Sequence, residues 1–244
     1  MIRRAVAAAL ACACAATALS ACESTQDTSA RLAKRAKGLA NQQGLKIGRD
    51  NPGVRVGTTA VVHDANGIAA VVELQNTGAA QAALPVAIAV DDAKGKPIFR
   101  NDAAGLDPSL VEMPLLRKGE HAWWVNNQVT AAGVPVKVAA RVGQARAAAP
   151  ANTPVIEISN VHVGSDADGI FAEGIVTNRS KIAQKRLTIF CVARRGTTVV
   201  AAGRAIIDRL APAPTPKPTK FTVFFIGNPK GARLEFAAPP TVLK

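Results

Sequence analysis

The stretch Asp64-Ala-Asn-Gly-Ile68 recurs later in the chain as Asp166-Ala-Asp-Gly-Ile170, and this pair decides the fold prediction. Both copies are followed by β-branched and apolar residues, as expected for strands that enter and leave a tight turn. Both central residues of a type I′ turn need positive φ, which Asn, Asp and Gly tolerate best. Asn66-Gly67 and Asp168-Gly169 therefore predict two hairpins of the same kind.

Further matches, in the same order along the chain, extend this repeat. Because several matches keep one order, we infer an internal duplication. The matched segments are Asn76–Gly78 with Asn178–Ser180, Leu84–Val90 with Leu187–Ala193, and Ala122–Val125 with Phe221–Phe225.

Each copy consists of short β-branched or alternating runs separated by turn residues. Strands at this spacing over about 100 residues are typical of a β-sandwich with immunoglobulin-like connections. We therefore predict an all-β fold with two tandem immunoglobulin-like β-sandwich domains.

The N-terminus has the parts of an export signal. Arg3 and Arg4 give it a positive start, and an Ala-rich apolar stretch and small residues follow. The apolar stretch, Ala5–Ala18, is shorter than the roughly 18–20 residues that a membrane-spanning helix needs. The stretch is followed by Leu19-Ser-Ala-Cys22, which has the order aliphatic, small, small, Cys.

This tetrapeptide resembles the lipobox of bacterial lipoproteins. The resemblance implies that Cys22 receives a diacylglycerol on its sulfur and that signal peptidase II cuts after Ala21. Two or three acyl chains, palmitate among them, then anchor the protein stably, because each buried methylene contributes about 0.8 kcal/mol. The implied location is extracytoplasmic, on the cell membrane or the outer membrane. The competing interpretation is an ordinary secretory signal, in which Cys22 is an accidental thiol.

The leader and the repeat together predict the domain organisation. A flexible or partly helical segment separates the leader from the first strand pattern, and an Ala- and Pro-rich segment separates the two copies. The predicted parts are a signal peptide at 1–21, a lipidated basic tether at 22–51, a first β-sandwich at 52–144, a linker at 145–154 and a second β-sandwich at 155–244.

The order of strands and turns also resembles the FxLYD-type domains of bacterial envelope lipoproteins. In the second copy it is carried by Gly174–Asn178, Leu187–Ala193, Gly196 and Phe221–Phe225, and the likeness covers most of residues 55–240. The chain contains no Tyr, so the aromatic-Leu-Tyr-Asp signature itself is absent. The resemblance implies an extracytoplasmic adhesion, spacer or interaction module, and it brings no catalytic residues.

The chain is strongly basic, with a formal net charge of +13 at pH 7. Nucleic acid is not expected as a partner, because the chain carries an export signal and no basic run is interleaved with stacking aromatics. An anionic lipid or a cell-wall polymer fits this charge, and so does solvated charge without a dedicated partner. Within the tether, Arg31, Lys34, Arg35 and Lys37 suit either contact with anionic lipid or a solvated spacer.

No residue pattern predicts a catalytic, metal or cofactor site. Asp166-x-Asp168-Gly169 resembles the start of a calcium loop, but the further oxygen ligands and the bidentate Glu do not follow it. The histidines are isolated in sequence, and no G-x-S-x-G motif marks a nucleophile. Cys191 lies in a strand-like run and is expected to be a small buried apolar residue. We therefore expect no enzyme activity and no cofactor.

The pair Trp123-Trp124 is the one candidate binding feature of the repeat. Neighbouring residues of a strand point to opposite faces, so the two rings cannot enter the same core. An exposed ring beside Arg117 and Lys118 would form a binding patch for carbohydrate, peptide or protein. In the alternative interpretation the second ring packs under a loop or on the neighbouring domain.

These features predict a lipid-anchored cell-envelope protein of non-enzymatic binding, adhesion or spacer type. Its expected partners are membrane lipid through Cys22 and an envelope protein. Two alternatives belong to other classes: an accessory subunit of an envelope transport or assembly complex, and an extracytoplasmic enzyme.

Overall fold

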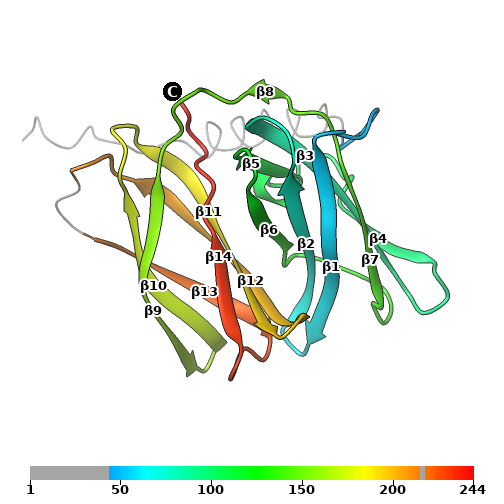
Figure 1. Ribbon diagram of the computed structural model, residues 1–244. Coiled ribbons are helices and arrows are strands. Elements are labelled where there is room, and N and C mark those ends of the chain that lie inside the picture. Colours follow the sequence, from blue (N-terminus) through cyan, green and yellow to red (C-terminus); the bar gives the residue numbers. More distant parts are fainter. Residues whose placement is uncertain (1–43, 215–217) are drawn as a thin grey trace, which may run out of the picture. The chain divides into compact units, whose positions relative to one another are not determined.

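The computed structural model describes residues 44–214 and 218–244. These residues form strands, turns and one short 3-10 helix, so the predicted all-β fold is confirmed (Figure 1). Over the same ranges, no helix is long and apolar enough to span a membrane. The predicted signal peptide, Cys22 and the basic tether residues Arg31, Lys34, Arg35 and Lys37 lie outside the described residues.

The first half, residues 44–154, contains two antiparallel sheets. Its elements are β1 (Val54–Asp64), β2 (Gly67–Asn76), β3 (Gln81–Asp91), β4 (Pro97–Arg100), η1 (Pro108–Leu110), β5 (Glu112–Leu116), β6 (His121–Asn126), β7 (Lys137–Val142) and β8 (Ala147–Ala148). One sheet has the order β1-β2-β6. In the other, the start of β3 pairs with β5 and β8, and its end pairs with β4 and β7.

The second half, residues 155–244, forms one sheet with the order β14-β11-β12-β13-β10-β9. β12 and β13 pair only between Ala201–Gly203 and Phe225–Gly227, so the sheet divides at this junction into two groups of strands. The strands are β9 (Ile156–Asp166), β10 (Gly169–Asn178), β11 (Gln184–Arg195), β12 (Thr198–Leu210), β13 (Thr219–Gly227) and β14 (Arg233–Ala237).

The two halves repeat one pairing scheme. The group β9-β10-β13 matches β1-β2-β6, and β14-β11-β12 matches β7-β3-β4. An irregularity recurs with it: Ala83 in β3 and Arg186 in β11 have φ of 52° and 49°. Ala83 is skipped in the register of β3 with β5, and Arg186 is skipped in the register of β11 with β12. Positive φ is unfavourable for a residue with a Cβ. Its recurrence at matched positions supports the inferred duplication.

Both predicted hairpins are present, but the predicted type I′ turns are wrong. Asp64 pairs with Gly67, so the central turn residues are Ala65 and Asn66 rather than Asn66 and Gly67. Gly67 has positive φ, at 139°, whereas Asn66 does not. The physical reason is the Asp64 carboxylate, which accepts the Asn66 N–H at 2.7 Å and fixes the turn one residue earlier.

A buried Asn organises the turn that follows β2 and β10. The Asn178 amide donates to the Ile182 carbonyl at 2.7 Å, and its Oδ1 accepts the Ser180 N–H at 2.9 Å. Asn76 plays the same part in the first half, where its amide donates to the Ala79 carbonyl at 2.8 Å. The repeated Asn-x-Gly/Ser motif is therefore a structural element of the fold.

Replacing Asn178 with Ala should lower the free energy of unfolding by roughly 1–3 kcal/mol, because buried turn groups lose their partners. Urea unfolding followed by circular dichroism measures this change. Asn152→Ala is a matched control, since Asn152 is exposed, and it should stay within about 0.5 kcal/mol of the parent. Equal losses in the two variants would contradict the structural role of Asn178.

The buried residues form two hydrophobic clusters, and one of them spans both halves. It brings Trp124 and Val125 of β6 together with Phe190 and Val192 of β11. Alternate residues of β11, such as Ile189, belong instead to the cluster inside the second half. Both faces of β11 are therefore covered, which explains its unbroken apolar run. The described residues, 44–214 and 218–244, accordingly belong to one compact unit, and the boundaries within it stay predictions.

Candidate functional site

Both tryptophans of the predicted binding patch are buried. Trp124 is 0% exposed and Trp123 is 6% exposed. The Trp123 ring packs on the second half, where Glu235 accepts its indole N–H at 2.6 Å and Arg194 lies 5.6 Å over its centre. The predicted patch with an exposed ring is therefore wrong, and the alternative of a contact with the neighbouring half is correct. The physical reason is that the outer face of β6 is covered by β11 and β14.

The two basic residues of that patch also do not form a joint site. Arg117 donates to the Thr153 hydroxyl at 3.1 Å and to the Pro154 carbonyl at 2.7 Å. It thereby fastens the predicted linker to the first half. Lys118 is exposed in the turn between β5 and β6.

Two histidines of the described residues, His121 and His162, each lie beside one carboxylate. His162 Nε2 lies 2.7 Å from Glu173 Oε1, and both side chains are exposed. His121 of β6 lies 3.7 Å from Glu73 of the neighbouring strand β2. Within residues 44–214 and 218–244, no group of three or more His, Cys, Asp or Glu residues is placed to hold a metal ion. Cys191 is fully buried, as predicted, and burial raises the pKa of its thiol far above the ordinary range.

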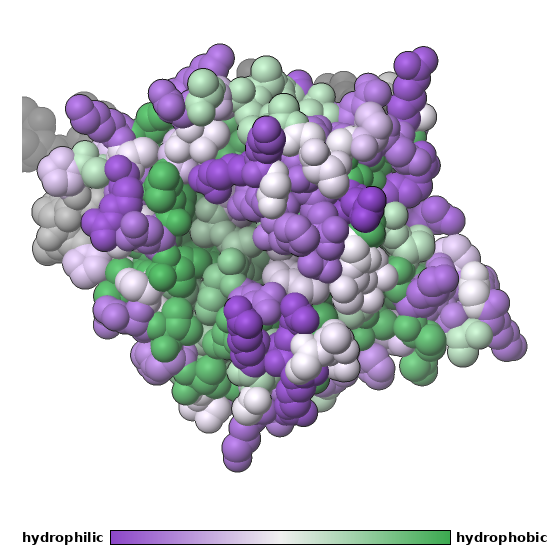
Figure 2. Space-filling model, viewed as in Figure 1, coloured by the Kyte–Doolittle hydropathy of each residue, from purple (hydrophilic) through white to green (hydrophobic). Residues whose placement is uncertain are grey.

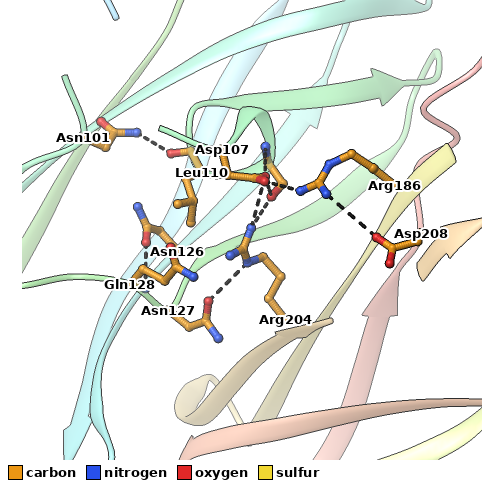
Figure 3. A network of polar contacts seen from close by, with 10 residues as sticks. Asn101, Asp107, Leu110, Asn126, Asn127, Gln128, Arg186, Arg204 and Asp208 are labelled. Atoms are coloured by element: carbon orange, nitrogen blue, oxygen red, sulfur yellow. Dashed lines mark hydrogen bonds and ion pairs between the residues drawn. The ribbon is translucent and has the colours of Figure 1, made fainter. Parts of the chain in front are cut away.

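A polar cluster joins the two halves (Figure 3). Its centre is the Arg204 side chain of β12, which is 5% exposed and lies 3.7 Å from Asp107. The Arg204 guanidinium also donates to Asn127 at 3.2 Å and to the Ser109 hydroxyl. Arg186 of β11 forms a second ion pair with Asp107. The charges in this cluster pair with one another, so its role is to hold the halves together.

The pKa of Asp107 lies below its ordinary value. Burial alone raises the pKa, but hydrogen bonds from Ser109 and the charge of Arg186 together outweigh burial. Burial lowers the pKa of Arg204, whereas the Asp107 charge raises it.

Asp107 should make stability depend on pH in the acid range. Its carboxyl has a lower pKa in the folded state than the value of about 3.9 expected after unfolding, so its stabilisation is present above that value and is lost as the pH falls through the folded pKa. Asp107→Asn should lower the free energy of unfolding at pH 7 by roughly 1–3 kcal/mol, because Arg204 loses a charged acceptor. The difference from the parent should shrink towards pH 3.

Urea unfolding at a series of pH values measures this dependence. Asp102→Asn is the control, because Asp102 is exposed and lies outside the cluster. A difference between Asp107→Asn and the parent that stays constant from pH 7 to pH 3 would argue against a lowered pKa.

An apolar groove of about 550 Å³ opens between β9 and β14. Figure 2 shows hydrophobic side chains gathered on this face, over the strands that Figure 1 labels β9 and β14. These strands are the two outer strands of the six-stranded sheet, so each has an edge that no other strand of the described residues pairs. The groove is lined by Ile156, Ile158, Val161, Leu234, Phe236 and Ala238.

The groove residues are half-buried rather than covered. Further apolar side chains are exposed along β9 or next to it, with Val155 at 50% and Val163 at 46%. Apolar surface of this kind often marks a site of interaction with another molecule. The sequence did not reveal this site, because the alternation of Ile156 and Ile158 signals a strand whether or not a neighbour covers it.

No model of a known protein family matches this chain, and a comparison with curated proteins gives no match. The interpretation of the groove therefore depends on its geometry.

Proposed function

We propose that this protein is a non-enzymatic binding protein of the bacterial cell envelope, anchored by acyl chains on Cys22, and that the groove between β9 and β14 is its binding surface. The observation that carries the binding role is the groove itself, where apolar side chains of two edge strands stay open to water. A partner that covers this surface would gain about 25 cal/mol for each Å² of apolar area removed from water.

The anchor and the location follow from the sequence in this proposal. The lipobox-like Leu19–Cys22 supports lipid attachment and export to the cell membrane or the outer membrane. The cations of the tether, Arg31, Lys34, Arg35 and Lys37, would lie next to the anchor and favour anionic lipid or a cell-wall polymer.

The finer fold assignment is part of the same proposal. The two halves would be tandem immunoglobulin-like β-sandwiches that arose by duplication, related to the FxLYD-type domains of envelope lipoproteins. The shared pairing scheme and the matching irregularities at Ala83 and Arg186 support this assignment.

Site-specific crosslinking in intact cells tests the binding role. A photoreactive residue at position 158 faces the groove. One at position 175 faces outward, because Ile175 pairs across the strands with Lys220, which is exposed on the opposite face of the sheet. We expect position 158 to give a discrete adduct with an envelope protein and position 175 to give little. Equal adducts at both positions, or none at either, would contradict binding through the groove.

A further inference from the structure

We infer that the groove receives an extended segment of another protein, which adds to the free edge of β14 as an antiparallel strand. This inference rests on the proposed function and specifies its partner: a peptide with apolar side chains at alternate positions and without positive charge. Backbone hydrogen bonds along the edge would supply affinity, and the groove would select the alternate side chains.

The first half shows how the corresponding edge is covered. There β7 is the counterpart of β14, and the segment before β1 reaches the C-terminal end of β7. The Asn51 N–H donates to the Val142 carbonyl at 2.9 Å, and Asp50 forms an antiparallel bridge with Gly143. The chain thus already contains an extended segment beside this edge, in the antiparallel direction.

The first half is also closed by a direct contact between β1 and β7. The Thr59 hydroxyl donates to the Val138 carbonyl at 3.0 Å. In the second half the position of Thr59 is taken by Val161, as the strand registers show. Valine has no hydroxyl, so the same closing hydrogen bond cannot form between β9 and β14.

The segment that precedes β9 is held elsewhere. Within it, β8 pairs with Gln81 and Ala82 at the start of β3. Its end is fixed by Arg117, which binds Thr153 and Pro154. The counterpart of the covering segment is therefore attached to the first half, and the edge of β14 has no covering segment from the described chain.

Matched positions show the consequence for burial. Val54, Val138 and Val142 are 8%, 3% and 4% exposed in the first half. Their counterparts Ile156, Leu234 and Ala238 are only half-buried, whereas the other three matched pairs are half-buried in both halves. At four of the six matched positions the residue has more non-hydrogen atoms where the groove is open, and at one, where Ala238 matches Val142, it has fewer. The matched pairs of the six lining positions are Val54 with Ile156, Val56 with Ile158, Thr59 with Val161, Val138 with Leu234, Ala140 with Phe236, and Val142 with Ala238.

Charge favours a different protein over a second copy as the occupant. The chain carries a net charge of +13, so two copies repel each other when their surfaces approach. Arg233 and Arg179 near the groove are each paired with a carboxylate, Glu235 at 3.8 Å and Glu157 at 2.7 Å, so the preference depends on the net charge of the whole chain. A neutral segment with acidic flanks complements this net positive charge.

A synthetic peptide tests the inference on the mature, lipidated chain in detergent. The probe has nine residues, the length of β13, with valines alternating with threonines and aspartates at both ends. The control peptide has the same side chains, but alternate backbone amides are N-methylated, so it cannot donate along a strand edge. Fluorescence anisotropy of labelled peptides should show binding that N-methylation weakens about tenfold or more.

Hydrogen exchange identifies the strand that receives the probe. Amides of β14 should gain protection when the unmethylated peptide binds, because edge strand addition pairs them. Equal affinity of both peptides, or protection confined to other strands, would overturn strand addition at β14.

Matched protein variants link the peptide to the groove. Ile158→Thr should weaken probe binding about fivefold to tenfold, since the ethyl branch of a groove side chain is replaced by a hydroxyl. Ile175→Thr makes the same change on the outer face and should leave the affinity unchanged. Equal effects in two folded variants would refute the assignment. Concentration-dependent dimerisation that Ile158→Thr abolishes, measured by sedimentation, would replace the foreign segment with a second copy.

These outcomes separate the inference from the proposed function. A groove-specific adduct in cells, combined with a probe that is insensitive to N-methylation, would retain the binding role and reject strand addition. Absence of any groove adduct in cells would reject the binding role itself.

Discussion

Replacing Trp124 with Ala is expected to lower the free energy of unfolding by about 3–5 kcal/mol. Trp124 is 0% exposed and is the largest fully buried side chain in the described residues. It pairs with Val72 across β2 and β6 and belongs to the cluster that both halves share. Its side chain points away from the second half, because the neighbouring Trp123 packs on that half, so its removal leaves a cavity in the core of the first half.

Two comparisons test this expectation by urea or thermal unfolding. Phe224→Ala removes an aromatic side chain that is 40% exposed, and it should cost less than half as much. Trp124→Phe should be the milder of the Trp124 variants, because the indole N–H has no hydrogen-bond partner among the described residues. A similar loss in Trp124→Ala and Phe224→Ala would show that Trp124 does not stabilise the core in the way described.

Replacing Cys22 with Ala is expected to abolish lipid labelling, in line with the proposed anchor. The sulfur of Cys22 would be the attachment point, so Ala leaves the acyl chains without a nucleophile. The leader would remain uncut, and metabolic labelling with palmitate followed by gel electrophoresis would show an unlabelled, longer chain. The anchor is strong because acyl chains contribute about 0.8 kcal/mol for each buried methylene.

Cys191→Ala is the matched control for this experiment. Cys191 is fully buried in β11 and has a raised thiol pKa, so it is not available for acylation. Labelling should be unchanged in this variant. Labelling that survives in Cys22→Ala would refute the lipoprotein assignment and favour an ordinary secretory signal.

The local pattern of residues predicted much of the fold. Alternating β-branched runs and turn residues located the strands, and the repeated Asp-Ala-Asn/Asp-Gly located both hairpins. The repeat also predicted that the two halves share their order of strands. These features depend on neighbours within a few residues, so they can be inferred from the sequence. The turn type was wrong because a side-chain hydrogen bond of Asp64, rather than backbone preference, fixed the turn.

The sequence by itself determined the all-β character, the two hairpins at the repeated motif and the burial of Cys191. Only the tertiary structure decided that Trp123 is covered and that the groove beside Ile158 is open. Both depend on contacts between segments far apart in the chain: β11 and β14 lie over the outer face of β6, and the segment before β9 is held by the first half. A strand has the same alternation of residues whether or not its edge is paired, so its local sequence does not show which edge is uncovered.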